Sequence, residues 1–111
     1  NVVSGDFDMV PTLAVIDVSF ISLKIVMPLV IKLLSSDAKV IALVKPQFEV
    51  GKGRVGKGGV VRDPLLHAEV LDDIQSGAKN WPVDILGVVE SPILGAKGNK
   101  EFFLGLHKRS D

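Results

Sequence analysis

The sequence predicts an α/β domain with a mostly parallel sheet and one antiparallel strand. Apolar runs of strand length occur at 12–17, 39–45 and 83–90, and a helical pattern separates each run from the next. A fourth run at 101–107 follows the third without a helix between them. Strands separated by helices pair in parallel through right-handed crossovers, whereas strands joined by a short connection are most simply antiparallel.

The composition is that of a single folded domain. The chain has 111 residues, of which 47% are hydrophobic, and this is enough for a buried core. Its 13 basic and 13 acidic residues cancel, so any affinity for nucleic acid must come from a local patch. Because the chain has no cysteine, disulfides, a thiolate nucleophile and cysteine-ligated metal are excluded, which favours a cytoplasmic protein.

We expect neither a membrane span nor a signal peptide. The longest apolar stretch, at 20–34, is interrupted by two lysines and Pro28, so it is typical of a core helix. The chain does not open with a basic segment followed by an apolar one. It begins with Asn1 rather than methionine, and we expect it to be a fragment of a longer protein.

The first half of the chain has clear strand and helix signals. The runs at 12–17 and 39–45 are continuous and apolar, as in strands buried on both faces. Ser22 is expected to cap a helix at about 23–35, which Pro28 either kinks or delays. The predicted inner face of this helix comprises Leu23, Val26, Val30, Leu33 and Leu34.

A second helix is predicted after a glycine-rich loop. Asp63 is expected to cap it, with Pro64 at its first position. Trp81 is expected to pack in the turn that leads to the strand at 83–90. The apolar residues at helical spacing are Leu66, Val70, Ile74 and Ala78.

The loop "GKGRVGKGG" at 51–59 matches two nucleotide-binding patterns, but neither is in the right context. A Walker loop has Ser or Thr after its lysine, whereas Gly58 follows Lys57 here. A dinucleotide fingerprint begins directly after a strand, whereas "PQFEV" precedes the first glycine. We interpret the segment as a basic loop suited to contacting a nucleic-acid phosphate backbone, the alternative being a solvated surface loop. The residues of the loop that would make these contacts are Lys52, Arg54, Lys57 and Arg62.

Polar residues at the strand ends form a candidate catalytic site. Asp17 ends the first strand and Lys45 the second, and ligands of such sheets bind at the carboxyl ends of the strands. Glu101 begins the last strand, although an exposed edge residue is the alternative at this position. A lysine between two carboxylates suits general-base chemistry, because neighbouring charges tune its proton affinity. His67 and His107 lack metal-ligand spacing, so no metal site is expected.

Four consecutive segments carry the motifs of a known family. They are "DVSFISL" (17–23), "LVKPQFEVGKG" (43–53), "VGKGGVVRDP" (55–64) and "SPILGAKGNKEFFL" (91–104). In this order they resemble the C-terminal motifs of the TlyA family, often labelled haemolysin A, within the FtsJ-like ribose 2′-O-methyltransferases. The resemblance implies the C-terminal half of a Rossmann-like class I methyltransferase fold, S-adenosylmethionine as cofactor, and ribosomal RNA or a ribosomal subunit as partner.

The resemblance also implies a Lys-Asp-Lys-Glu catalytic set. Asp17 matches the aspartate, which is also the implied cofactor-binding residue, Lys45 matches the second lysine, and Glu101 matches the glutamate. The first lysine, the glycine-rich cofactor loop, the acidic ribose-binding residue and the N-terminal RNA-binding domain have no counterpart here. We therefore expect residues 1–111 to be a partial methyltransferase domain that is inactive alone.

In the family, the strand at 12–17 pairs with the strand that bears the cofactor loop. Without that neighbour its edge should be open, and an open apolar edge invites strand addition. We expect these residues to self-associate and to bind the cofactor weakly or not at all.

There are two alternative functions. The haemolysin label suggests a pore-forming or membrane-lytic protein, but the sequence has neither a spanning segment nor a strongly basic amphipathic helix. A base amino-methyltransferase carries D/N-P-P-[YFW] at the same strand end, whereas "DVSF" lacks both prolines. With Lys45 and Glu101 present, ribose is the expected target.

Overall fold

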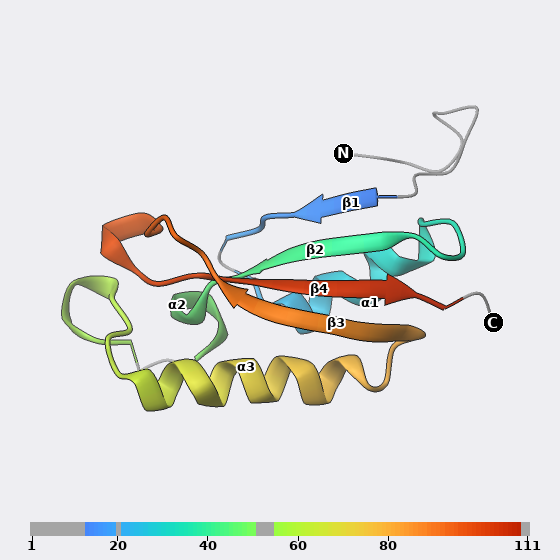
Figure 1. The fold of residues 1–111 in the computed structure, drawn as a ribbon. Coiled ribbons are helices and arrows are strands. Elements are labelled where there is room, and N and C mark those ends of the chain that lie inside the picture. The colour runs from blue at the N-terminus through green and yellow to red at the C-terminus, as the bar shows by residue number, and fades with distance from the viewer. Residues whose placement is uncertain (1–12, 20, 51–54, 110–111) are drawn as a thin grey trace.

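The computed structural model describes residues 13–19, 21–50 and 55–109 as a sheet with helices packed against it (Figure 1). The strands are β1 (Leu13–Ile16), β2 (Lys39–Val44), β3 (Val83–Glu90) and β4 (Phe102–Lys108). The helices are α1 (Leu23–Lys32), α2 (Pro46–Glu49) and α3 (Pro64–Ala78), with short 3-10 turns η1 (Lys57–Gly59) and η2 (Ala96–Gly98).

The strand order of the sheet is β1-β2-β4-β3. β1 pairs with β2 in parallel, and β4 is antiparallel to both of its neighbours. Three strands therefore run in one direction and one in the other, which confirms the predicted fold class. The expected parallel pairing of the second and third strands is absent among the described residues, because β4 lies between them.

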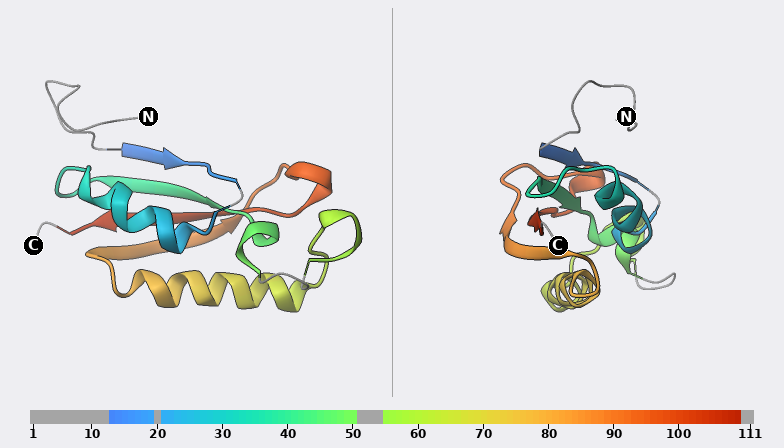
Figure 2. Two further views of the ribbon diagram at one scale, coloured as in Figure 1. Left: turned by 180° about the vertical axis from the view of Figure 1, so that it is seen from behind. Right: turned by 90° about the vertical axis from the view of Figure 1, so that its right-hand side faces the viewer.

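Helices α1 and α3 cover the same face of the sheet (Figure 2), and the core lies between them and the strands. On the opposite face Leu13 and Val15 of β1 are 59% and 68% exposed. The expectation that this strand is buried on both faces is therefore wrong for the described part of the chain. It is also wrong for β2, where Ile41 on the same face is 39% exposed. The main core residues are Leu23, Met27, Ile31, Val40, Ala42, Val44, Val70, Ile74, Ala78, Trp81, Phe102, Leu104 and Leu106.

The predicted helix caps are confirmed. The Ser22 hydroxyl accepts a hydrogen bond from the Lys24 N–H, and the Asp63 carboxylate accepts one from the Leu65 N–H. Pro64 occupies the first turn of α3. These local signals fix where both helices begin, and Pro64 needs no partner there because proline has no N–H.

The predicted extent and inner face of α1 need correction. The helix ends at Lys32, three residues earlier than predicted, and Pro28 lies inside it rather than delaying its start. The fully buried residues of the helix are Leu23, Met27 and Ile31, whereas the predicted Val26 and Val30 are only partly buried. The buried stripe follows a spacing of four residues, which brings side chains on successive turns onto one face.

The strand ends that carry the candidate site lie together at one end of the sheet, on the left in Figure 1. β2 leads into α2 there, and the connection from β3 to β4 passes through η2. Val44 pairs with Phe102 in the antiparallel register. Lys45 and Glu101, one residue beyond this pair, therefore emerge from neighbouring strands.

Candidate functional site

Lys45 joins the ends of β1 and β2. Its Nζ lies 2.5 Å from Asp17 Oδ1 and donates a hydrogen bond to Ser19 Oγ at 3.1 Å. The Lys45 side chain is only 13% exposed, whereas that of Asp17 is 59% exposed. The structure thus brings together two of the predicted catalytic residues and leaves the carboxylate of Asp17 open to a ligand.

Glu101 is buried at the start of β4, with an exposure of 7%. Its carboxylate accepts a hydrogen bond from Gln47 Nε2 at 3.4 Å, and Gln47 lies two residues after Lys45. The alternative of an exposed edge residue is therefore wrong. Through α2, the third predicted catalytic residue is tied to the segment that carries Lys45.

Glycine at position 95 makes room for Glu101. The Glu101 carboxylate lies against Gly95 so closely that a Cβ at this position would overlap it. The surrounding turn is closed by a hydrogen bond from the Gly95 N–H to the Asn99 carbonyl at 2.7 Å. The connection from β3 to β4 therefore contacts the Glu101 carboxylate in addition to Gln47.

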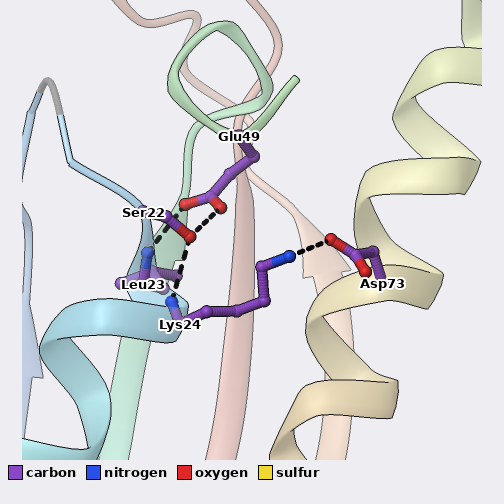
Figure 3. A network of polar contacts seen from close by, with 5 residues as sticks. All are labelled: Ser22, Leu23, Lys24, Glu49 and Asp73. Atoms are coloured by element: carbon purple, nitrogen blue, oxygen red, sulfur yellow. Dashed lines mark hydrogen bonds and ion pairs between the residues drawn. The ribbon is translucent and has the colours of Figure 1, made fainter. Parts of the chain in front are cut away.

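A second carboxylate, that of Glu49, ties α2 to the start of α1 (Figure 3). The Ser22 hydroxyl donates to Glu49 Oε1 at 2.7 Å, and the Leu23 N–H donates to Glu49 Oε2 at 2.9 Å. A negative charge at this position also complements the α1 dipole. The segments that follow β1 and β2, which carry Ser19 and Lys45, are thereby fixed to each other.

Burial raises the pKa of Glu49 above its ordinary value, and the hydrogen bonds from Ser22 and Leu23 oppose this shift. Next to this group, Lys24 Nζ lies 2.5 Å from Asp73 Oδ2, which links α1 to α3 (Figure 3). Both side chains of that pair are substantially exposed, at 42% and 55%. Glu49 is therefore the partly buried member of the network, and the Lys24–Asp73 pair is the exposed one.

The predicted RNA-binding residues are only partly described by the structure. Lys52 and Arg54 lie outside the described residues, and Lys57 is the first residue of η1. Arg62 is exposed and lines a pocket together with Lys97 and Lys100. Arg62 is thus brought near two lysines of the β3–β4 connection that the sequence did not single out.

Ser19, Gln47 and Glu49 are the site residues that sequence reasoning missed. Ser19 follows Asp17 by two residues, a spacing that returns a side chain to the same side of an extended segment. Gln47 and Glu49 lie in the "PQFE" turn directly after Lys45. Polar residues this close to a candidate lysine are a signal that could have found them.

The histidines lie apart from this site. His67 Nε2 lies 2.8 Å from the Val61 carbonyl, and the ring meets Phe102 edge-on at 5.7 Å. His107 Nε2 lies 3.3 Å from Asp37 Oδ1. In the part of the chain that the structure describes, no group of His, Asp and Glu side chains is arranged to hold a metal ion.

Comparisons with known proteins agree with the resemblance seen in the sequence motifs. The 16S/23S rRNA (cytidine-2'-O)-methyltransferase TlyA of Mycobacterium tuberculosis is 48% identical over 99 residues, which cover 89% of this chain and 37% of that protein. Hemolysin A of Brachyspira hyodysenteriae is 39% identical over 95 residues, which cover 86% of this chain and 40% of that protein. The chain thus spans well under half the length of these relatives.

A solved structure has a fold similar to that of this chain. A crystal structure of a "putative hemolysin" from Lactococcus lactis aligns with a TM-score of 0.90 and 38% sequence identity, covering 100% of this chain and 53% of that one. The family model for FtsJ-like methyltransferases matches residues 4–108. This match covers nearly the whole sequence, and the chain therefore belongs to the FtsJ-like methyltransferase family.

Proposed function

We propose that this chain is part of the catalytic domain of an enzyme that methylates ribose 2′-hydroxyl groups of ribosomal RNA with S-adenosylmethionine. The observation that carries the proposal is the Lys45–Asp17 contact at the strand edge where Glu101 is also held. The activity named for the Mycobacterium tuberculosis relative supports it. Because the chain spans 37% of that relative, the proposal concerns a full-length protein that contains this chain.

We assign to Lys45 the orientation of the reacting hydroxyl. Its Nζ donates to both Asp17 and Ser19, and these contacts hold the amino group at the end of β2. A lysine amino group at this position can hold the ribose oxygen in line for attack and take up the proton that the hydroxyl loses. Because these contacts fix where the amino group lies, orientation is the role that they support best.

Glu101 and Gln47 are proposed to complete the polar surface beside Lys45. Gln47 Nε2 donates to Glu101, while Gln47 Oε1 is buried and accepts no hydrogen bond among the described residues. An unsatisfied buried acceptor costs about 1–3 kcal/mol. Gln47 is thus held beside Glu101 through its amide nitrogen.

The cofactor is proposed to meet this chain at Asp17. When bound, S-adenosylmethionine supplies an electrophilic methyl group on a cationic sulfonium. The carboxylate of Asp17 fits such a ligand because it is 59% exposed and carries the opposite charge. We propose a cytoplasmic location because the proposed substrate belongs to ribosomes.

Substitution of Lys45 in the full-length protein tests the proposal. Lys45→Ala should lower methyl transfer from labelled S-adenosylmethionine to ribosomal subunits by about 100-fold or more, while cofactor affinity changes little. Lys39→Ala, at the opposite end of β2, is the matched control and should retain activity. Undiminished turnover by Lys45→Ala would sink the assignment.

The chemical position of the methyl group separates the two methyltransferase alternatives. Nucleoside digestion followed by mass spectrometry should find the added methyl on ribose. A methyl group on an exocyclic base nitrogen would instead support a base amino-methyltransferase.

The second candidate is a membrane-lytic function, because the Brachyspira relative is named Hemolysin A. Among the described residues, no helix has the length and apolar character needed to cross a bilayer. A dye-leakage assay on liposomes tests this function directly. Leakage that persists in Lys45→Ala would favour lysis over methyl transfer.

A further inference from the structure

We propose that a basic pocket beside the strand ends binds a phosphate group of the RNA substrate, and this inference rests on the proposed function. The basic pocket has a volume of about 360 Å³. Arg62, from the loop before α3, lines one side, and Lys97 and Lys100, from the β3–β4 connection, line the other. Lys100 directly precedes Glu101, so the basic pocket adjoins the candidate catalytic site.

The charge of the basic pocket suits an anion. Among the described residues that line it there is no carboxylate, and Lys97 and Lys100 form no ion pair within the described part of the chain. Since the whole chain has no net charge, this positive potential is local. A separate hollow beside α3 is lined instead by acidic residues, namely Glu49, Glu69, Asp72 and Asp73. A polyanion is thus attracted to one of these two hollows and repelled by the other.

Buried side chains hold the two sides of the basic pocket together. Asn99, which is 1% exposed, accepts a hydrogen bond from the Val61 N–H at 2.9 Å and donates to the Gly59 carbonyl at 3.0 Å. His67 Nε2 lies 2.8 Å from the Val61 carbonyl. Both backbone groups of Val61 are therefore engaged, which fixes the adjacent Arg62 before any ligand arrives. A preorganised site loses less entropy on binding.

Two glycines of the "GKGRVGKGG" loop lie beneath the cations. A Cβ at Gly59, where φ is 78°, would lie 3.1 Å from Lys97 Nζ. A Cβ at Gly56 would lie 2.5 Å from the Val60 carbonyl oxygen and 3.7 Å from Arg62 Nη1. These glycines permit the turn of the loop and leave space for the basic side chains. Nucleotide binding is therefore not needed to explain why glycines occur at these positions.

Lys97 has a backbone conformation that glycine would favour. Its φ is 58° and its ψ is 20°, in the left-handed region, which costs a residue with a side chain about 1 kcal/mol. A lysine kept in this conformation at the mouth of a basic pocket is consistent with a function for its ammonium group. The strain also gives a test in which stability and binding change in opposite directions.

The main experiment measures binding of a short fluorescent single-stranded RNA to the 111-residue chain by anisotropy, without cofactor. The double variant Lys97→Gln/Lys100→Gln should lose roughly 5-fold in affinity per lost contact at about 0.1 M salt, and its salt slope should fall by about 0.7 for each contact. The control Lys39→Gln/Lys79→Gln removes the same charge from exposed positions at the start of β2 and the end of α3. Equal losses in both double variants, no loss in the first, or no RNA binding by the wild type would each overturn the proposal.

Two further measurements sharpen the result. Lys97→Gly should bind RNA more weakly while its Tm stays the same or rises, whereas a parallel fall in Tm and affinity would point to a structural role and overturn the proposal. Inorganic phosphate at constant ionic strength should displace the RNA only at a far higher concentration than that of the RNA, and displacement at a similar concentration would assign the basic pocket to free phosphate instead. If Lys45→Ala abolishes methyl transfer but the double variant binds RNA normally, the proposed function stands and the basic pocket does not. If Lys45→Ala retains methyl transfer but the double variant loses RNA affinity, the basic pocket is supported and the proposed function is not.

Discussion

The carboxylate of Glu101 packs directly against Gly95, in a space that a Cβ at position 95 would fill. Gly95 is not among the residues with positive φ, so glycine is needed here for space rather than for backbone conformation. We therefore predict that Gly95→Ala displaces the Glu101 carboxylate from its contact with Gln47. A displacement of about 1 Å in a reacting geometry can lower turnover by about 100-fold, which single-turnover methyl transfer by the full-length protein would detect.

The control for this prediction is Gly77→Ala in α3. A Cβ at Gly77 would make ordinary contacts, at 3.5 Å, with the Lys24 side chain. Replacing a helical glycine by alanine stabilises a helix by up to about 1 kcal/mol, so this variant should keep its activity and its Tm should not fall. Full activity in Gly95→Ala would show that the position of the Glu101 carboxylate does not matter for the reaction.

The stability of the domain should depend on pH through Glu49. Burial raises the pKa of this carboxyl group above 4.5, so the folded state binds the proton more tightly than the unfolded chain does. The stability that Glu49 contributes is therefore complete below pH 4.5 and is lost as the pH rises through the raised folded value. Glu49→Gln should remove this loss. As the pH rises through this window, the free energy of unfolding should therefore fall less for the variant than for the wild type.

Urea denaturation at several pH values measures the effect. Glu90→Gln, at the exposed end of β3, controls for the loss of one surface carboxylate and should follow the wild-type profile. Parallel profiles for Glu49→Gln and the wild type would contradict the prediction.

Within the network of Figure 3, Ser22 should matter more for stability than Asp73. The Ser22 hydroxyl both caps α1 and donates to Glu49, so Ser22→Ala should cost about 1–2 kcal/mol. Asp73 belongs to an exposed ion pair, so Asp73→Asn should cost less than about 1 kcal/mol. Thermal unfolding of both variants tests the ranking, and equal costs would refute it.

Features with local causes could be predicted from the sequence. The caps at Ser22 and Asp63 depend on residues within one turn, and the structure has them as expected. The pairing of Asp17 with Lys45 follows from one rule, because the carboxyl ends of parallel strands meet at the same edge.

Features with non-local causes could not be predicted in this way. The hydrogen bond that Glu101 accepts comes from Gln47, which is 54 residues away in the sequence. The placement of β4 between β2 and β3 is likewise determined by tertiary packing, since a short connection specifies only that β3 and β4 are antiparallel. The basic pocket depends on Asn99 bonding to a segment 38 residues distant, so its two lysines looked like ordinary residues of a turn.

The open face of the sheet leads to a last prediction, that the 111-residue chain self-associates through β1. In the described part of the chain β1 is one of the two edge strands, the other being β3, and its exposed Leu13 and Val15 continue the apolar surface of an open groove of about 520 Å³ over β2, β3 and β4. Unpaired edges and large apolar patches favour association. Val15→Lys should therefore shift the chain toward monomer in sedimentation velocity, because a charge on this face would have to be buried in the interface. Ile25→Lys changes a residue of α1 that is 61% exposed, and it should leave the association unchanged. A wild-type chain that is monomeric at all concentrations, or equal dissociation by both variants, would rule out β1 as the contact.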